Sequence, residues 1–108
     1  MAGEIKIDVD QLFHALGDGT RRAMLDLLVE GPRSVSQLAQ VLGVTLTAVG
    51  QHLQILEQCR LVKTEKLGRV RTCSLEPGGF DALEQWVRDH RTAWEMRLDR
   101  LGDLLGGE

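Results

Sequence analysis

Residues 34–75 have the sequence SVSQLAQVLGVTLTAVGQHLQILEQCRLVKTEKLGRVRTCSL, in which two short helical patterns precede a basic hairpin pattern. Ser34 is followed three residues later by a glutamine, which is the spacing of a capping box at a helix N-terminus. Gly43 ends this first helix, and Thr45 can cap a second helix over about residues 45–58 after a very short turn. Two short helices joined this tightly predict a helix-turn-helix.

The second helix separates its side chains by chemistry. At about 100° per residue, an apolar face and an uncharged polar stripe fall almost opposite each other. The apolar face comprises Leu46, Val49, Leu53 and Leu56, and the polar stripe comprises Thr47, Gln51, Gln54 and Gln58. A solvent-exposed helix face usually carries charged residues, whereas amides that donate and accept hydrogen bonds suit the edges of bases. The stripe therefore predicts a DNA-recognition helix, with a plain solvated helix face as the alternative.

The segment that follows predicts a basic β-hairpin over about residues 61–75. It is rich in Val and Thr, and its two strands are expected to meet at Leu67-Gly68. Residues 60–71 carry five cations and one acid, a sum of +4. The cations nearest the tip are Lys66, Arg69 and Arg71. Cations at a hairpin tip can contact phosphates or enter the minor groove, but they also protect edge strands from unwanted pairing.

The flanking segments are predicted to be helical. Apolar spacing indicates a helix from Val9 to Leu16, and Thr20 is expected to cap a central helix over residues 21–30. A long helix over about residues 80–105 carries an apolar residue at every third or fourth position. That stripe comprises Phe80, Leu83, Val87, His90, Trp94, Leu98, Leu101 and Leu105. The expected fold class is mainly α with a small β-hairpin.

The uneven distribution of charge matters more than the net charge of −3. Residues 1–18 sum to −3 and residues 74–108 to −4, so the +4 segment is a basic stripe on an acidic body. A net negative charge argues mildly against nucleic acid as a partner. A local basic stripe, however, can bind a polyanion in one orientation. Arg21, Arg22 and Arg33, at helix starts, are further candidates for phosphate contacts.

A chain of 108 residues supports one domain, expected at residues 9–105 after an N-terminal tail of residues 1–8. No apolar run approaches the roughly 20 residues that span a bilayer. The start, MAGEIKIDVD, is acidic and lacks the apolar core of a signal peptide. Two cysteines without such a signal indicate a reducing compartment. We therefore expect a cytoplasmic protein without a membrane partner.

The two cysteines are Cys59 and Cys73. If Gly68 centres the hairpin turn, Cys73 lies opposite Lys63 and too far from Cys59 for a disulfide, whose Cα atoms must lie within about 7 Å. Both are expected to be small buried apolar residues. The alternative is a redox switch, because nearby arginines can lower the pKa of a thiol.

The runs LGDGTRRAMLDLL and SVSQLAQVLGVTLTAVGQHLQILEQCRLVKTEKLGRVRTCSLEP together resemble the ArsR/SmtB family of bacterial winged-helix repressors. The resemblance covers about residues 9–105. It implies a winged helix-turn-helix, and a homodimer that is joined through the first and last helices and binds an operator with twofold symmetry. The last segment, WVRDHRTAWEMRLDRLGDLL, resembles a subgroup with a Trp-rich closing helix, often without a known metal.

The resemblance assigns roles to matching positions. A helix-turn-helix places the start of its second helix in the major groove. The residues predicted to contact bases are Thr47, Ala48 and Gln51. The basic hairpin over about residues 61–75 corresponds to the family's wing. The residues predicted to contact the DNA backbone, from the recognition helix, the wing or a helix start, are His52, Gln54, Arg33, Lys66, Arg69 and Arg71. The predicted dimer interface comprises Leu12, Phe13, Leu16, Val87, His90, Trp94, Leu98 and Leu101.

Two positions depart from the family pattern. Gly50 stands where the family commonly has Ser, and glycine inside a helix costs roughly 1 kcal/mol relative to Ala. It either permits a closer approach to DNA or weakens the helix. Arg60 stands where a Gly commonly ends the recognition helix, and it adds a positive charge near the wing.

The family's best-known activity is metal sensing, and its ligands are absent here. The helix SQLAQVL has no cysteine pair, and Asp89 and His90 in the last helix are merely adjacent. A histidine without a second ligand is not a zinc site, so His90 is expected to pack in the dimer interface. We predict neither a metal nor a cofactor. The sequence also has no Gly-rich phosphate loop and no nucleophile elbow, so we expect no enzymatic activity.

These observations predict a dimeric, sequence-specific transcriptional repressor that binds double-stranded DNA at an inverted repeat. The alternative is a winged-helix protein-interaction module that does not bind DNA. The acidic body and Gly50 favour the alternative, whereas the glutamine stripe and the +4 hairpin oppose it. The sequence leaves the inducer unknown.

Overall fold

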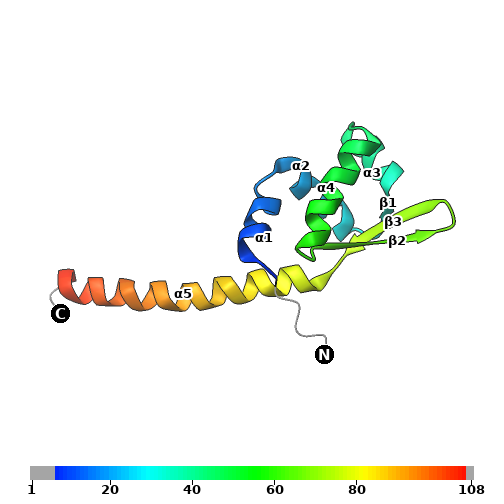
Figure 1. Ribbon diagram of the computed structural model, residues 1–108. Coiled ribbons are helices and arrows are strands. Elements are labelled where there is room, and N and C mark those ends of the chain that lie inside the picture. Colours follow the sequence, from blue (N-terminus) through cyan, green and yellow to red (C-terminus); the bar gives the residue numbers. More distant parts are fainter. Residues whose placement is uncertain (1–6, 107–108) are drawn as a thin grey trace, which may run out of the picture.

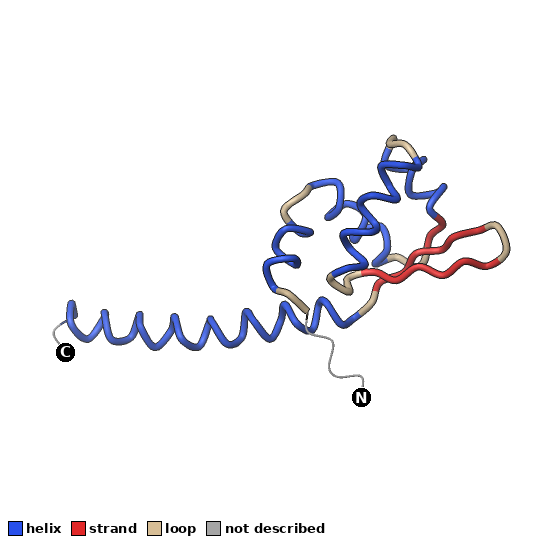
Figure 2. Tube along the Cα trace, viewed as in Figure 1, coloured by secondary structure: helices blue, strands red, loops and turns tan. Residues whose placement is uncertain are grey.

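The computed structural model describes residues 7–106, arranged as helices around a small sheet (Figures 1 and 2). The helices are α1 (Val9–Leu16), α2 (Gly19–Val29), α3 (Val35–Leu42), α4 (Leu46–Gln58) and α5 (Pro77–Gly106), and the strands are β1 (Arg33–Ser34), β2 (Val62–Leu67) and β3 (Val70–Leu75). The prediction of a mainly α fold with a hairpin is confirmed. Most of the predicted N-terminal tail lies outside the described residues.

The helix-turn-helix begins and ends at the residues that the sequence indicates. The Ser34 hydroxyl accepts from the Gln37 backbone N–H at 3.1 Å, and the Gln37 side chain accepts from the Ser34 N–H at 2.9 Å. Gly43 ends α3 with φ +69°, a left-handed conformation that glycine adopts without strain. The Thr45 hydroxyl then caps α4 by accepting from the Ala48 N–H at 3.0 Å. The predicted capping box and caps of the helix-turn-helix are confirmed.

The prediction that Thr20 caps the central helix is wrong. Asp18 is the N-cap of α2, and its carboxylate accepts from the Arg21 backbone N–H at 2.9 Å. This hydrogen bond is the main reason why the pKa of Asp18 lies below its ordinary value. Because a carboxylate at a helix N-terminus also interacts with the helix dipole, Asp18 is the stronger cap of the two.

The sheet is antiparallel, with strand order β1-β3-β2. Leu67 pairs with Val70, so the β2–β3 turn consists of Gly68 and Arg69. Gly68 has φ +63°, as the first central residue of a type II′ hairpin turn requires. The turn is therefore centred half a residue later than expected, and Cys73 lies opposite Thr64 rather than Lys63. Strand β1 was not predicted from the sequence, because its two residues carry no detectable strand pattern.

The core lies between the helices and the sheet. Its buried residues are Leu12, Ala15, Met24, Leu25, Leu28, Leu38, Ala39, Val49, Leu53, Leu56, Cys59, Leu61, Val62 and Cys73. Leu46 is exposed, so its assignment to the apolar face of α4 is wrong; it lies in the first turn, beyond the edge of the core. Leu12 is completely buried within the single chain, so its assignment to a dimer interface is also wrong.

Helix α5 runs along one edge of the body and extends well beyond it (Figure 1). Its first turns pass beneath α1, where Phe13 packs edge-on against Trp86 with ring centroids 5.0 Å apart. Its C-terminal half extends away from the other elements, and the molecule is 66 Å long. Val87, Trp94, Leu98 and Leu101 are exposed along it. Within residues 7–106, none of the helices combines the length and the apolar character needed to span a bilayer.

Candidate nucleic-acid interface

The uncharged stripe of α4 is fully presented to solvent. Thr47, Gln51, Gln54 and Gln58 are exposed, whereas Val49, Leu53 and Leu56 are buried and fix the helix on the core. Ala48 is half-buried beside the stripe. The apolar contacts hold the backbone of α4, so the polar side chains project from a rigid element, which suits the recognition of a rigid surface.

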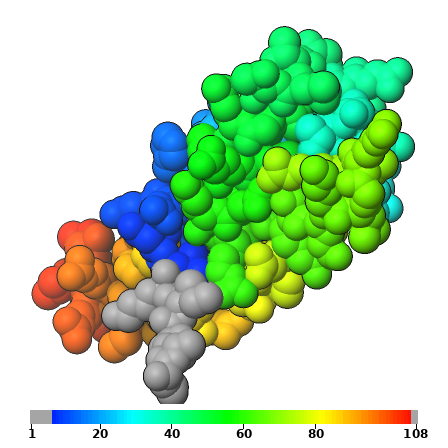
Figure 3. Space-filling view, turned by 45° about the vertical axis from the view of Figure 1, so that its right-hand side comes forward, coloured from blue at the N-terminus to red at the C-terminus, as the bar shows by residue number. Residues whose placement is uncertain are grey.

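The hairpin lies beside α4, and the two elements share one face of the molecule (Figure 3). Lys66 and Arg71 are cross-strand neighbours in the ladder, and Arg69 lies in the turn. All three side chains are exposed. The molecule therefore presents an uncharged helix edge and a cluster of cations side by side, although these segments are separate in the sequence.

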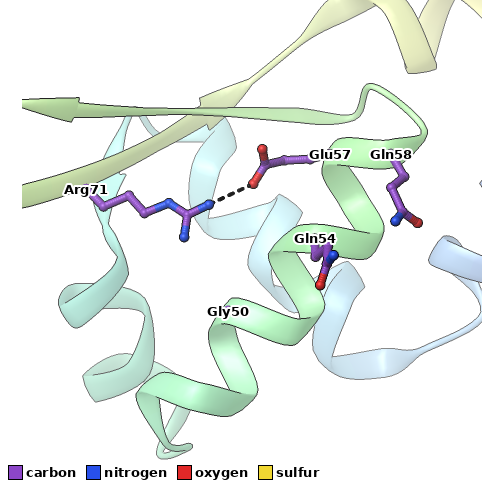
Figure 4. Close-up of a pocket in the computed structure, with 5 residues that line it drawn as sticks. All are labelled: Gly50, Gln54, Glu57, Gln58 and Arg71. Carbon is purple, nitrogen blue, oxygen red and sulfur yellow. Dashed lines mark hydrogen bonds and ion pairs between the residues drawn. The ribbon is translucent and has the colours of Figure 1, made fainter.

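An ion pair fixes the hairpin to α4. Arg71 Nη2 lies 3.2 Å from Glu57 Oε1 and donates to Thr64 Oγ1 at 3.3 Å (Figure 4). The Glu57–Arg71 pair is half-exposed, so we expect it to contribute at most about 1 kcal/mol to stability, but it orients the Arg71 guanidinium toward α4. Glu57 was not among the residues predicted from the sequence, because its partner lies 14 positions further along the chain.

Between α4 and Arg71 the surface is hollowed by a groove of about 450 Å³. It is lined by Gly50, Gln54, Glu57, Gln58 and Arg71 (Figure 4). A second groove of about 440 Å³ lies between the start of α4 and the wing and includes Leu46, Arg69 and Val70. Arg71 lines both grooves, so both lie on the side of α4 that faces the hairpin.

Gly50 forms part of the open side of the first groove, and a methyl group there would meet no atom within 4 Å. We expect Gly50→Ala to raise the free energy of unfolding by about 1 kcal/mol, because alanine removes the cost of glycine inside a helix without creating a clash. Thermal unfolding at fixed protein concentration should show a midpoint higher by about 4–8 °C. An unchanged or lower midpoint would contradict this reading of Gly50.

The arginines outside the hairpin differ in availability. Arg21 is buried, so its candidacy for a phosphate contact is wrong. Arg22 is exposed and donates from Nη1 to the Leu16 carbonyl at 2.6 Å. Arg33 pairs with Glu30 at 3.0 Å and donates to the Leu27 carbonyl at 3.3 Å. Arg60 forms two hydrogen bonds with Glu76, at 2.8 and 3.1 Å, so its charge is largely balanced.

His52 and His90 both have specific contacts. His52 Nδ1 lies 3.2 Å from Arg21 Nη1, and this contact joins α4 to α2. His90 stacks on Trp86 with ring centroids 4.0 Å apart, and its Nδ1 lies 2.9 Å from the Trp86 carbonyl oxygen. Within residues 7–106, no three His, Cys, Asp or Glu side chains are grouped so that they could hold a metal ion.

Both thiols are completely buried, and Cys59 donates to the Ile55 carbonyl at 3.5 Å. Burial raises the pKa of the Cys73 thiol to about 11 and also raises the pKa of Cys59. Arg71 lowers the pKa of Cys73, but the effect of burial is larger. The expected lowering by nearby arginines is therefore wrong, and with it the basis for a redox switch.

At pH 8 we therefore expect neither thiol of the folded protein to react within minutes with an aromatic disulfide reagent, because the reactive thiolate is scarce and shielded. In denaturant both cysteines should react at once. The released chromophore measures this directly. Rapid modification of one thiol in the native protein would contradict the burial that the structure assigns.

The tight α3–α4 turn, the exposed α4 and the flanking basic hairpin together define a winged helix-turn-helix DNA-binding protein. The model of the family described as "Bacterial regulatory protein, arsR family" matches residues 18–64. The chain is 39% identical over 99 residues to the HTH-type transcriptional regulator Rv2034 of Mycobacterium tuberculosis, covering 87% of this chain and 92% of that protein. The chain belongs to the arsR family, whose members are transcriptional regulators.

Solved structures agree over nearly the whole fold. An ArsR-like transcriptional regulator from Rhodococcus sp. RHA1 superposes with a TM-score of 0.82 and 27% identity, over 93% of this chain and 92% of that one. The homodimeric winged helix-turn-helix DNA-binding domain Mb0332 from Mycobacterium bovis has a TM-score of 0.60 and 32% identity. That comparison covers 85% of this chain and 94% of the other.

Proposed function

We propose that this regulator is a homodimeric, sequence-specific repressor that recognises an inverted repeat in double-stranded DNA. The observation that carries the proposal is the exposed, uncharged stripe of α4 beside the basic hairpin. A duplex presents base edges in its major groove and phosphates on either side of it. A helix edge without charge next to a cluster of cations is complementary to that pattern.

In this proposal the two parts of the surface have different roles. Thr47, Ala48 and Gln51 lie in the first half of α4, the part that a helix-turn-helix places against bases. Gln51 is suited to two hydrogen bonds with adenine, and the Ala48 methyl to a thymine methyl. The backbone contacts are assigned to His52, Gln54, Arg33, Lys66, Arg69 and Arg71. Arg33 and Arg71 would exchange their present partners for phosphate oxygens.

The dimer is proposed to form along α5, because most of its apolar stripe is exposed in the single chain and only Leu83 and His90 are half-buried. The stripe is nearly symmetric about the midpoint between His90 and Arg91. Val87 and Trp94, Leu83 and Leu98, and Phe80 and Leu101 lie at equal distances on either side of it. Two copies of α5 that pair in opposite directions therefore match apolar residues along the stripe. The homodimeric state of the Mycobacterium bovis relative is consistent with this arrangement.

A dimer of this kind sets two recognition helices about 34 Å apart, one turn of B-DNA, and so predicts an inverted repeat. Selection of bound duplexes from a random pool tests the proposal. Enrichment of two half-sites related by twofold symmetry would support it. Failure to shift any duplex at low salt would instead favour a winged-helix module that binds proteins and not DNA.

The division of roles predicts different behaviour for two variants. Gln51→Ala should weaken binding to the selected duplex by about 10-fold or more and leave binding to a random duplex unchanged, because a base contact is lost. Arg69→Ala should weaken binding to both duplexes and reduce the slope of log K against log salt by about 1. Fluorescence anisotropy titrations over a range of salt measure both effects. Equal behaviour of the two variants would contradict the assignment.

A further inference from the structure

A buried arginine connects the recognition helix to the helices on its other side. Arg21, in the first turn of α2, donates from Nε to the Ala15 carbonyl at 2.8 Å and from Nη2 to the His14 carbonyl at 3.0 Å. Its remaining arm, Nη1, lies 3.2 Å from His52 Nδ1. The two carbonyls at the end of α1 hold the guanidinium plane, so the direction of the third hydrogen bond is set.

This arrangement determines the tautomer of the neutral His52 ring. A guanidinium nitrogen has only hydrogens to offer, so it can hydrogen-bond to Nδ1 only where Nδ1 carries a lone pair. Neutral His52 must then carry its proton on Nε2. Asp18 also faces the ring, with Oδ2 4.0 Å from Nδ1. Because Nδ1 is engaged with Arg21, Asp18 does not determine the tautomer of the neutral ring.

The Nε2–H group reaches the surface of the molecule. Within residues 7–106, every buried side-chain nitrogen or oxygen has a hydrogen-bond partner. His52 forms its hydrogen bond through Nδ1, so Nε2, for which these residues supply no partner, is accessible to solvent. The His52 side chain is 23% exposed and directly follows Gln51 on α4. The His52 Nε2–H group is therefore a single neutral donor beside the polar stripe, and the contact of Nδ1 with Arg21 fixes the orientation of the ring.

We propose that His52 donates one hydrogen bond through Nε2–H to a phosphate oxygen of bound DNA, and that Arg21 is the positioning residue that holds the ring in the tautomer and orientation for it. The inference rests on the proposed DNA-binding function and adds a coupling to it. The end of α1, the start of α2 and the recognition helix are joined through one guanidinium. Displacement of α1 would therefore move a DNA contact.

Two substitutions separate the two ring nitrogens. Asparagine at position 52 offers an oxygen near the place of Nδ1 and so can accept from Arg21, but it has no group at the place of Nε2. Glutamine reaches the place of Nε2 with an amide N–H. We expect His52→Asn to bind both the selected and a random duplex about tenfold more weakly, since a hydrogen bond to a charged group is lost. His52→Gln should recover binding to within about threefold.

His14→Asn is the matched control, because His14 is an exposed histidine on α1 and its side chain lies outside the proposed contact. Equal losses in His52→Asn and His52→Gln would overturn the assignment of Nε2. A loss confined to the selected duplex would overturn the phosphate as acceptor and place the contact on a base. In every case the wild-type protein must shift duplex DNA, and this separates the inference from the proposed function.

The role of Arg21 has its own test. Arg21→Lys keeps the charge but loses the planar fork. We expect it to weaken DNA binding in the wild-type background and to add little to His52→Asn, because it acts through His52. Thermal unfolding identifies variants that remain folded. Nitrogen-15 NMR of the wild-type protein, at a pH at which the His52 ring is neutral, should show the ring proton on Nε2. A proton on Nδ1, or additive losses in the double variant, would overturn the proposal.

Discussion

Gly79→Ala is expected to lower the free energy of unfolding by about 3 kcal/mol, the upper part of the range for overpacking in a well-packed site. A methyl group on Gly79 would collide with the backbone carbonyl oxygens of Cys59 and Arg60, the latter at 2.8 Å. These atoms belong to the chain between α4 and β2 and cannot rotate away. The Gly79 N–H also donates to the Arg60 carbonyl at 2.7 Å, which holds the two backbones together.

Gly78→Ala is the matched control. At this neighbouring position in the first turn of α5, an added methyl would touch only the flexible side chain of Arg60, at 3.4 Å and beyond. We expect it to cause no loss of stability, because the Arg60 side chain can shift and alanine also removes the cost of a glycine in a helix. Urea unfolding of both variants, with fixed protein concentration, measures the difference. Similar stabilities for the two variants would show that the backbones at Gly79 are free to separate.

The junction at Gly79 also explains how the chain accommodates Arg60. Arg60 has φ +60°, and the hydrogen bonds Arg60 N to Glu57 O and Leu61 N to Leu56 O complete a Schellman motif at the end of α4. A non-glycine residue in this conformation costs about 1–2 kcal/mol. The pair with Glu76 and the contact with Gly79 offset that cost and direct the chain into the wing.

The junction also marks how far the sequence predicts this fold. The caps at Ser34 and Thr45 were predictable because a cap is a local interaction within four residues. The departure from the family pattern at Arg60 was visible in the sequence, and so were the two adjacent glycines Gly78 and Gly79, which lie in the first turn of α5. The contact between these two segments could not be predicted, because it depends on where α5 crosses the end of α4. The cap at Asp18 was missed for a different reason: two adjacent candidates compete, and only the backbone conformation selects one of them.

The candidate interface also has features that the sequence predicts and features that it does not. Periodicity placed Gln51 on the exposed edge of α4, and the charge count placed cations on the hairpin. The contacts that orient this surface, Arg21 with His52 and Glu57 with Arg71, join residues 31 and 14 positions apart. Such pairs result from the packing of whole helices and strands against one another, so no local sequence pattern predicts them. The spacing of residue types along the sequence therefore predicts the exposed residues of a site more readily than the contacts that orient them.

Leu98→Asp is expected to weaken dimerisation by about 1,000-fold, or about 4 kcal/mol. In the proposed antiparallel pairing, Leu98 of each copy packs near Leu83 of the other, so the dimer would bury two carboxylates without partners. Burying an unpaired charge in an apolar contact is among the costliest changes a surface residue can undergo. The folded core should persist, because Leu98 is 65% exposed in the single chain. The variant should therefore sediment as a folded monomer at micromolar concentration.

Met96→Asp provides the control on the same helix. Met96 is 56% exposed, and at about 100° per residue it lies on the face opposite the apolar stripe. It introduces the same charge at a comparable exposure, so a general effect on α5 would appear in both variants. We expect Met96→Asp to remain dimeric and to bind the selected duplex with wild-type affinity.

The monomeric Leu98→Asp should lose about 10²–10⁴-fold in affinity for the selected duplex, because two half-sites no longer act together. A dimeric Leu98→Asp would exclude this face of α5 as the interface. Full affinity of a monomeric variant would contradict the inverted-repeat operator instead.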